Sequence, residues 1–236
     1  MNKISLCITN YNRSSYLFKS FEQVIEDERI HEVVVVDDCS EIGIYKTVEE
    51  MCKYHPKIKL FRNQSNAGVY KNKKIAVSLA ESEYCIVFDS DNIISSDYLD
   101  KVYSVAWEPK TIFAPDFAEP VFDYRKYSSL TLNRTNAGRY AFQPQFDCLL
   151  NTMNYFVHRD TYLQVWKPKR DIKGADSIWF NYLWLSAGNE IHVLQGLRYY
   201  HRTDHNGQEH GSNFLNHARE STPVCKEIER MIQSMR

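Results

Sequence analysis

Short apolar runs alternate with amphipathic segments through the first hundred residues of the chain. Four runs are brief and bounded by polar residues, which predicts strands: Ile4–Ile8, Val33–Val36, Ile58–Phe61 and Tyr84–Phe88. Between them, apolar residues recur at helical spacing over residues 17–25, 44–52 and 75–80, and a further helix is expected from about Ser95 or Ser96. Four β–α units in a row predict an α/β fold, with a mostly parallel sheet and helices on both faces.

The pattern is looser after Trp107. Residues 113–150 are rich in Tyr, Phe, Asn and Arg without a clear period, so we expect loops and short strands there. Further strands are expected at Asn154–Val157, Ile191–Leu194 and Leu197–Tyr200, and helices at Thr161–Trp166, Asp176–Ser186 and from about Asn213 to the end. We expect one domain, with a first half at 1–107, a second half at 108–212 and a C-terminal helix at 213–236.

Composition excludes several classes of protein. The 236 residues carry 29 Lys and Arg against 30 Asp and Glu, a net charge of −1, which argues against nucleic-acid binding through a basic face and against a polybasic membrane-surface protein. The six cysteines form no C-x-x-C pair, so we expect mostly buried thiols in a reducing compartment. No signal peptide and no apolar run near the roughly 20 residues of a membrane span is present, and the simplest expectation is a cytoplasmic protein.

Several familiar site motifs are missing from the chain. None of the eight glycines has the spacing of G-x-G-x-x-G or of a Walker P-loop, so any bound nucleotide does not rest on a glycine cradle. The H-E-x-x-H, EF-hand and G-x-S-x-G patterns are also absent. The candidate chemistry therefore lies elsewhere.

Polar residues follow each of the four predicted strands. They are Thr9-Asn10-Tyr11, Asp37-Asp38, Arg62-Asn63 and Asp89-Ser90-Asp91. The carboxyl ends of strands form the ligand crevice of open α/β sheets, so we expect these groups to meet at one edge. Carboxylates gathered there repel one another unless a cation or hydrogen-bond donors neutralise them, and a divalent metal with a polyphosphate would do so.

The motifs together resemble those of the inverting glycosyltransferases of family two, which have the GT-A nucleotide-sugar fold. The resemblance rests on residues 5–13, on Val34–Ser40 as V-V-D-D-x-S, on Asn66-Ala67-Gly68, and on the D-x-D run that ends Glu83–Asp91. It covers most of the chain, most strongly 3–104 and 174–202, and it makes 1–107 the donor half and 108–212 the acceptor-side half.

The resemblance implies a set of nucleotide contacts. Thr9 and Tyr11 would contact the base through their backbone, and Asp38 would accept a hydrogen bond from a base N–H. The other residues assigned to the nucleotide are Asn10, Arg13, Asn66, Lys71, Lys73, Asp89 and Ser90. A UDP-sugar is the favoured donor, with guanosine and thymidine nucleotides as alternatives.

The resemblance also implies a metal and a base. Asp91, with Asp89 and His201, would ligate Mn²⁺ or Mg²⁺ bridging the diphosphate, as carboxylate oxygens suit hard cations. Asp176, at the start of a predicted helix, would be the catalytic base toward a carbohydrate or lipid-linked acceptor. From the residues alone, Asp176 fits a helix N-cap as well, and Asp89 and Asp91 fit caps of the helix that follows them.

Two other functions remain open at this point. One is a GT-A-like subunit that binds a nucleotide sugar without turnover, which the presence of Asp176 disfavours. The other is a sugar-phosphate nucleotidyltransferase, disfavoured because residues 8–15 contain no glycine for the loop such enzymes use.

Overall fold

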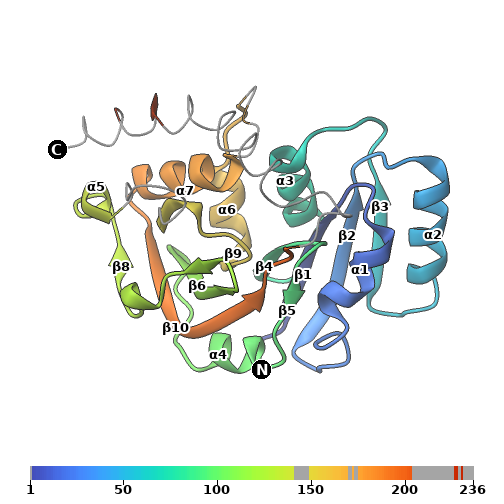
Figure 1. Ribbon diagram of the computed structural model, residues 1–236, viewed down its shortest axis with the longest axis horizontal. Coiled ribbons are helices and arrows are strands. Elements are labelled where there is room, and N and C mark those ends of the chain that lie inside the picture. The colour runs from blue at the N-terminus through green and yellow to red at the C-terminus, as the bar shows by residue number, and fades with distance from the viewer. Residues whose placement is uncertain are drawn as a thin grey trace.

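The computed structural model describes residues 2–140, 149–169, 172, 175–203, 226–227 and 230 (Figure 1). The strands are β1 (Ile4–Asn10), β2 (Ile30–Asp37), β3 (Ile58–Arg62), β4 (Tyr84–Asp89), β5 (Ile93–Ile94), β6 (Thr111–Glu119), β7 (Phe122–Asp123), β8 (Thr131–Leu132), β9 (Phe156–His158) and β10 (Glu190–Tyr200). The helices are α1 (Ser14–Phe21), α2 (Ile42–Cys52), α3 (Val69–Leu79), α4 (Tyr98–Tyr103), α5 (Ala137–Tyr140), α6 (Arg159–Val165) and α7 (Asp176–Ser186), with short 3₁₀ turns at Arg125–Tyr127 and Leu149–Asn151.

All of these strands join one sheet, in the order β3-β2-β1-β4-β9-β6-β10-β5, with β7 beside β6 and β8 beside β10. The first four strands are parallel, as predicted. Val33–Val36 of β2 is fully buried because helices cover both faces of the sheet. Helices α3, α6 and α7 pack together on one side, while α1 packs on α2 on the other (Figure 1).

The second half of the sheet is mixed. β9 is antiparallel to both β4 and β6, whereas β6 and β10 are parallel to each other. The expectation of loops and short strands from 113 onward is wrong for its first part, because β6 is a nine-residue strand in the middle of the sheet. Pro115 and the buried Asp116 interrupt the apolar pattern of β6, so the sequence did not predict a strand there.

The two strands expected at 191–194 and 197–200 are one strand, β10. Its pairing with β6 is irregular between Leu194 and Arg198, opposite Pro115, which has no N–H to offer the ladder. Gly196 has a φ of +76° in this irregular stretch, and its N–H donates to the Asp116 carboxylate at 2.9 Å. A glycine adopts this left-handed conformation without the penalty that a Cβ atom would bring.

Most helices agree with the sequence pattern, but α1 ends at Phe21, so the last part of the helix expected over 17–25 forms turns instead. Helix α7 covers the expected residues, and Ser177–Leu185 within it is buried throughout, as in a helix enclosed by the core. Helix α4 begins at Tyr98 instead of Ser95 or Ser96, with Asp97 as its N-cap residue. Asp89 and Asp91 therefore do not cap it. The expected helix at 213–236 lies outside the described residues except at 226–227 and 230, which are helical.

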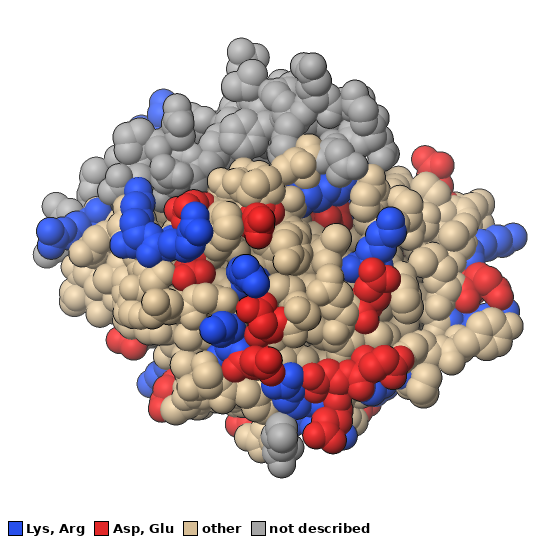
Figure 2. Space-filling model, turned by 60° about the horizontal axis from the view of Figure 1, so that its bottom comes forward, with Lys and Arg blue, Asp and Glu red and all other residues tan. Residues whose placement is uncertain are grey.

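The structure also bears on the expectations about cysteines, membrane spans and surface charge. Cys7, Cys39, Cys52 and Cys85 are free thiols and all but Cys39 are buried, while residues 148 and 225 lie outside the described part. None of the described helices has the length and apolar character needed to span a bilayer. On the face shown in Figure 2, acidic and basic side chains are interspersed, in keeping with a net charge near zero.

Candidate active site

The candidate site lies where β1 and β4 run side by side at the centre of the parallel sheet. The chain moves from β1 outward to β2 and β3 and then returns to place β4 on the other side of β1, so this is the topological switch point of the sheet. Register pairs Thr9 with Asp89, and the Thr9 hydroxyl donates to the Asp89 carboxylate at 3.3 Å. The strand ends thus meet at one edge, as the sequence predicts.

Some of the polar residues at this edge support the backbone. Asn10 and Ser90 are fully buried, and the Ser90 hydroxyl donates to the Asn10 side-chain oxygen at 3.3 Å. The Asn10 amide in turn donates to Asp37 at 3.0 Å, and Asp37 also accepts from the backbone N–H of Ser40. The side chains of Asn10 and Ser90 are therefore enclosed and already paired, and the structure gives no support to their assignment as nucleotide contacts.

Asp38 binds the loop that leads into α3. Its carboxylate accepts from the Asn63 amide at 2.8 Å and from the backbone N–H groups of Ala67 and Gly68 at 2.8 and 2.9 Å. Gly68 has a φ of +81° as the N-cap residue of α3, a conformation that suits glycine. Three of the roughly four acceptor positions of this carboxylate are thus occupied, which leaves about one for a base N–H.

Replacing Asp38 with alanine should therefore affect stability as well as nucleotide binding. The substitution leaves the Asn63 amide and two backbone N–H groups without their acceptor, and we expect it to cost on the order of 1–3 kcal/mol of unfolding free energy. Urea unfolding measures this loss. Ser104→Ala, which removes only an exposed hydroxyl bonded to its own helix end, is the control and should be nearly neutral. An Asp38→Ala protein as stable as the parent would contradict this loop-anchoring role.

Other predicted nucleotide residues are exposed along the same edge. Tyr11 is 47% exposed in the turn after β1, and Arg13 follows it. Asn66 is exposed and its side-chain oxygen accepts from the Gly68 N–H at 3.1 Å. Lys71 is exposed in the first turn of α3. These residues are accessible to a ligand at the edge.

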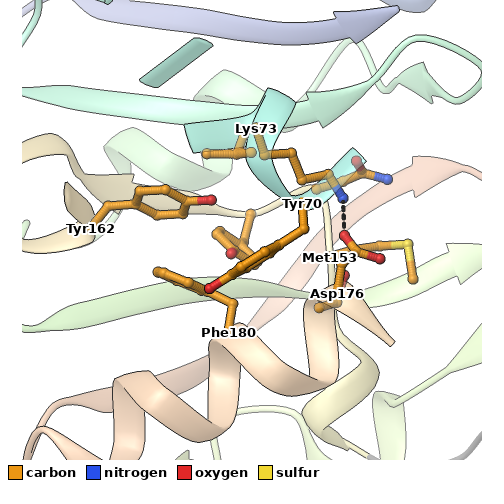
Figure 3. A pocket seen from close by; sticks show the side chains of 10 residues that line it. Tyr70, Lys73, Met153, Tyr162, Asp176 and Phe180 are labelled. Carbon is orange, nitrogen blue, oxygen red and sulfur yellow. Dashed lines mark hydrogen bonds and ion pairs between the residues drawn. The ribbon is translucent and has the colours of Figure 1, made fainter. Parts of the chain in front are cut away.

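Lys73 lies at the centre of the site. Its ammonium nitrogen is 3.0 Å from Asp176 Oδ2 (Figure 3) and 3.1 Å from Asp89 Oδ1. The side chains of Lys73, Asp89 and Asp176 are only 10, 12 and 14% exposed. Burial alone would lower the pKa of Lys73, but the Asp176 and Asp89 carboxylates outweigh it, so the pKa of Lys73 is raised above its usual value. Lys73 is therefore a buried cation that joins Asp89 to Asp176.

Asp176 is the first residue of α7. Ala175 occupies the N-cap position, so the alternative interpretation of Asp176 as the cap residue is wrong. Its side chain points toward Lys73 in a small pocket, and half of the other residues that line this pocket are aromatic (Figure 3). Burial, and then the charge of Asp176, raise the pKa of Tyr155 in that pocket, so this tyrosine stays neutral.

Asp91 is paired with a cation from the first turn. Arg13 Nη1 lies 2.9 Å from Asp91 Oδ2, and the Asp91 side chain is 11% exposed against 41% for Arg13. Within the described part of the chain, Lys73 pairs with Asp89 and Asp176, and Arg13 pairs with Asp91. Three carboxylates thus face two cations in these ion pairs, which leaves one negative charge uncompensated. Such a set of oxygen donors fits a hard divalent cation.

His201 comes to the same edge through β10. Strand β10 pairs with β5 so that Tyr200 lies opposite Ile93, and the Arg202 N–H donates to the Asn92 side chain at 3.1 Å. This register brings His201 beside the D-x-D run. Its ring packs edge-on against Phe122, with centroids 5.1 Å apart.

A compact metal-ligand cluster occurs at a different place. Among the described residues, the only three His, Cys, Asp or Glu ligand atoms that lie within 4.8 Å of one another belong to His31, Glu32 and Glu81. They lie toward the amino ends of β2 and β4, and Lys59 contacts Glu32 at 2.8 Å and Glu81 at 2.5 Å. The structure thus does not preassemble Asp89, Asp91 and His201 as a closed ligand set.

Three asparagines support the site, and two of them, Asn72 and Asn154, were not predicted from the sequence. Asn72 of α3 donates to the Val36 carbonyl and accepts from Asn63, which holds Asp38. Asn154 accepts from the Asp89 N–H at 2.9 Å. Asn63 directly follows a predicted strand end and was expected at this edge. Asn72 lies among the lysines of α3 and Asn154 begins a predicted strand, so neither position marked it as a site residue.

Comparison with known proteins gives one family. The family described as Glycosyl transferase family 2 matches residues 5–164. Abequosyltransferase RfbV of Salmonella typhimurium is 32% identical over 100 residues, covering 41% of this chain and 30% of that protein. Poly(ribitol-phosphate) beta-N-acetylglucosaminyltransferase TarS of Staphylococcus aureus is 25% identical over 236 residues, covering 91% of this chain and 38% of TarS. The chain therefore spans about a third of the length of these two relatives.

Solved structures show the same fold. Residues 1–349 of S. aureus TarS in complex with UDP-GlcNAc match with a TM-score of 0.67 at 19% identity, covering 92% of this chain and 64% of that one. The mannosyltransferase PcManGT from Pyrobaculum calidifontis, in complex with GDP-Man and Mn²⁺, matches with a TM-score of 0.67 at 14% identity, covering 99% and 74%. The architecture predicted from the sequence, GT-A, is confirmed by these likenesses.

Proposed function

Because the chain belongs to glycosyl transferase family 2 and has the GT-A fold, we propose that it transfers a sugar from a nucleoside-diphosphate donor to a carbohydrate or lipid-linked acceptor with inversion. The observation that carries this proposal is the group of three carboxylates at the switch point of the sheet, of which Lys73 pairs with Asp89 and Asp176 and Arg13 pairs with Asp91. Acids and cations together suit the binding of a metal diphosphate.

The donor would lie across the carboxyl ends of β1, β2 and β4. Tyr11, Arg13, Asn66 and Lys71 are accessible there. Asp38 is buried and holds the loop into α3, so a base N–H would reach it only through its one remaining acceptor position. The relative TarS is an N-acetylglucosaminyltransferase whose structure was solved with UDP-GlcNAc, which supports a UDP-sugar as the donor.

Asp91, together with Asp89 and His201, would hold Mn²⁺ or Mg²⁺. The bound cation supplies charge neutralisation that makes the diphosphate a better leaving group. PcManGT was solved with Mn²⁺, which supports this ion. Arg13 is then free to contact the diphosphate oxygens when Asp91 takes another partner.

Asp176 would be the base. The acceptor hydroxyl oxygen attacks the anomeric carbon while the bond from that carbon to the diphosphate oxygen breaks on the opposite face, and the hydroxyl proton passes to the Asp176 carboxylate. The location of Asp176 at the start of α7, facing the pocket beside Asp89, supports this role.

Calorimetric titration of UDP, GDP and dTDP, each with and without Mn²⁺, tests the proposal. We expect UDP to bind most tightly, and only weakly without the metal. Release of the diphosphate from a panel of nucleotide sugars then separates a transferase from a binding subunit. Donor binding with no release in the presence of any acceptor would favour the idle subunit, and pyrophosphate-dependent consumption of a nucleotide sugar would favour a nucleotidyltransferase.

A further inference from the structure

Lys73 contacts residues on both sides of the reaction. Asp89 belongs to the donor side, at the end of β4, and Asp176 is the base candidate on the acceptor side. Among the residues that the structure describes, Lys73 is the only cation within 4.0 Å of either carboxylate. The donor side and the base therefore share a single neutralising group.

We propose that Lys73 is a positioning residue shared between Asp176 and the donor diphosphate, so that a bound nucleotide competes with Asp176 for the same ammonium group. The inference rests on the proposed function and deepens it. With no donor bound, Lys73 holds the Asp176 carboxylate in an ion pair. When a diphosphate arrives, the ammonium turns part of its contact toward the phosphate oxygens and leaves Asp176 less restrained.

The backbone positions of Lys73 and Asp176 are fixed, but the lysine side chain can move between acceptors. Lys73 projects from α3 and Asp176 from the first turn of α7, and these helices contact each other directly. The backbone positions of both residues are therefore set by helix packing. The lysine ammonium, in contrast, ends a flexible four-carbon stem and carries three N–H donors that can be redistributed among acceptors.

The charge of Asp176 determines how strongly the Lys73 ammonium can bind an arriving diphosphate. A diphosphate brings two or more negative charges to a site where the acids already outnumber the cations. Attraction between the ammonium and the phosphates is strong in this poorly solvated place, but it is opposed by the loss of the ion pair with Asp176, which is only 14% exposed. The Asp176 charge thus weakens nucleotide binding through Lys73.

A double-mutant cycle in nucleotide affinity tests the inference without any turnover. We expect Asp176→Asn to bind UDP with Mn²⁺ about three- to tenfold more tightly than the parent, because Lys73 no longer leaves a charged partner. In a Lys73→Met background the same substitution should change the affinity much less. Lys73→Arg keeps a positive charge and should restore most of the effect of Asp176→Asn.

Net charge is the competing explanation, and Asp100→Asn controls for it. Asp100 is an exposed acid on α4, paired with Arg29 at 2.7 Å, so its substitution removes the same charge away from the site. It should leave UDP affinity unchanged. This comparison with Asp176→Asn stands even where Lys73→Met does not fold, which circular dichroism and thermal unfolding would show.

The outcomes separate the inference from the function on which it rests. UDP affinity in Asp176→Asn equal to that of the parent overturns the shared role of Lys73 and leaves the glycosyltransferase proposal standing. An equal gain in the Lys73→Met background, or an equal gain from Asp100→Asn, overturns it as well. Failure of the parent to bind UDP, GDP or dTDP overturns the proposed function and the inference together.

Discussion

Asp91→Ala is expected to abolish the Mn²⁺ dependence of UDP binding. Each acid of the D-x-D run has a cationic partner: Asp91 pairs with the more exposed Arg13, and Asp89 pairs with the buried Lys73. A divalent cation can therefore replace Arg13 at Asp91 more readily than it can replace Lys73 at Asp89. Without the Asp91 carboxylate the cation loses its principal oxygen ligand, and the diphosphate loses the neutralising charge that the cation brings. Calorimetric titration of UDP with and without Mn²⁺ measures the difference.

The substitution also changes what happens without metal. Arg13 loses its carboxylate partner in Asp91→Ala and becomes available to the diphosphate, so metal-free binding should remain or rise slightly while the response to Mn²⁺ disappears. Asp123→Ala is the matched control, because Asp123 also pairs with an arginine, Arg125, at 2.6 Å on an exposed turn. A parent protein with equal UDP affinity in both conditions, or an Asp91→Ala protein that still responds to Mn²⁺, would contradict this assignment.

The parallel half of the fold was predictable because its signals are local. Strands buried on both faces appear as unbroken apolar runs, such as Val33–Val36, and the helices between them repeat at helical spacing. Strand β6 was not predictable in the same way. It places Pro115 and Asp116 within a strand, and only the partner β10, with its irregular stretch at Gly196, makes those residues compatible with a sheet.

The candidate site was predictable as an edge but not as a set of contacts. Each polar group at a strand end is visible in the sequence, and the parallel topology gathers them. The sequence does not separate acids that anchor backbone, such as Asp37 with its bonds to Asn10 and Ser40, from acids that face a ligand. Both kinds occupy the same positions after a strand.

The link between Lys73 and Asp176 lay furthest from prediction. The two residues are 103 positions apart, and the contact exists because α3 and α7 pack on the same side of the sheet. The resemblance assigned Lys73 to the nucleotide, and no local pattern indicated that its ammonium lies between two carboxylates. That arrangement bears directly on the base.

Asp176→Asn is expected to reduce turnover by roughly 10²–10⁴-fold while the donor is still bound. Asparagine keeps the size of the side chain and a hydrogen-bonding oxygen, but it cannot accept the acceptor proton. The parent carboxylate lies 3.0 Å from the Lys73 ammonium, at the start of α7. It has to take up the hydroxyl proton only late, because that proton becomes acidic after the new bond to the oxocarbenium-like carbon is largely formed.

Two measurements on the same protein decide whether Asp176 is the base: the initial rate of diphosphate release with saturating donor, and the affinity for UDP. Asp160→Asn is the matched control, because Asp160 is an exposed acid in the first turn of the neighbouring helix α6, and it should keep the parent rate. An Asp176→Asn protein with the parent rate would place the base elsewhere. A joint collapse of rate and affinity would make Asp176 a structural residue, since a proton acceptor is needed for the chemical step and not for binding the donor.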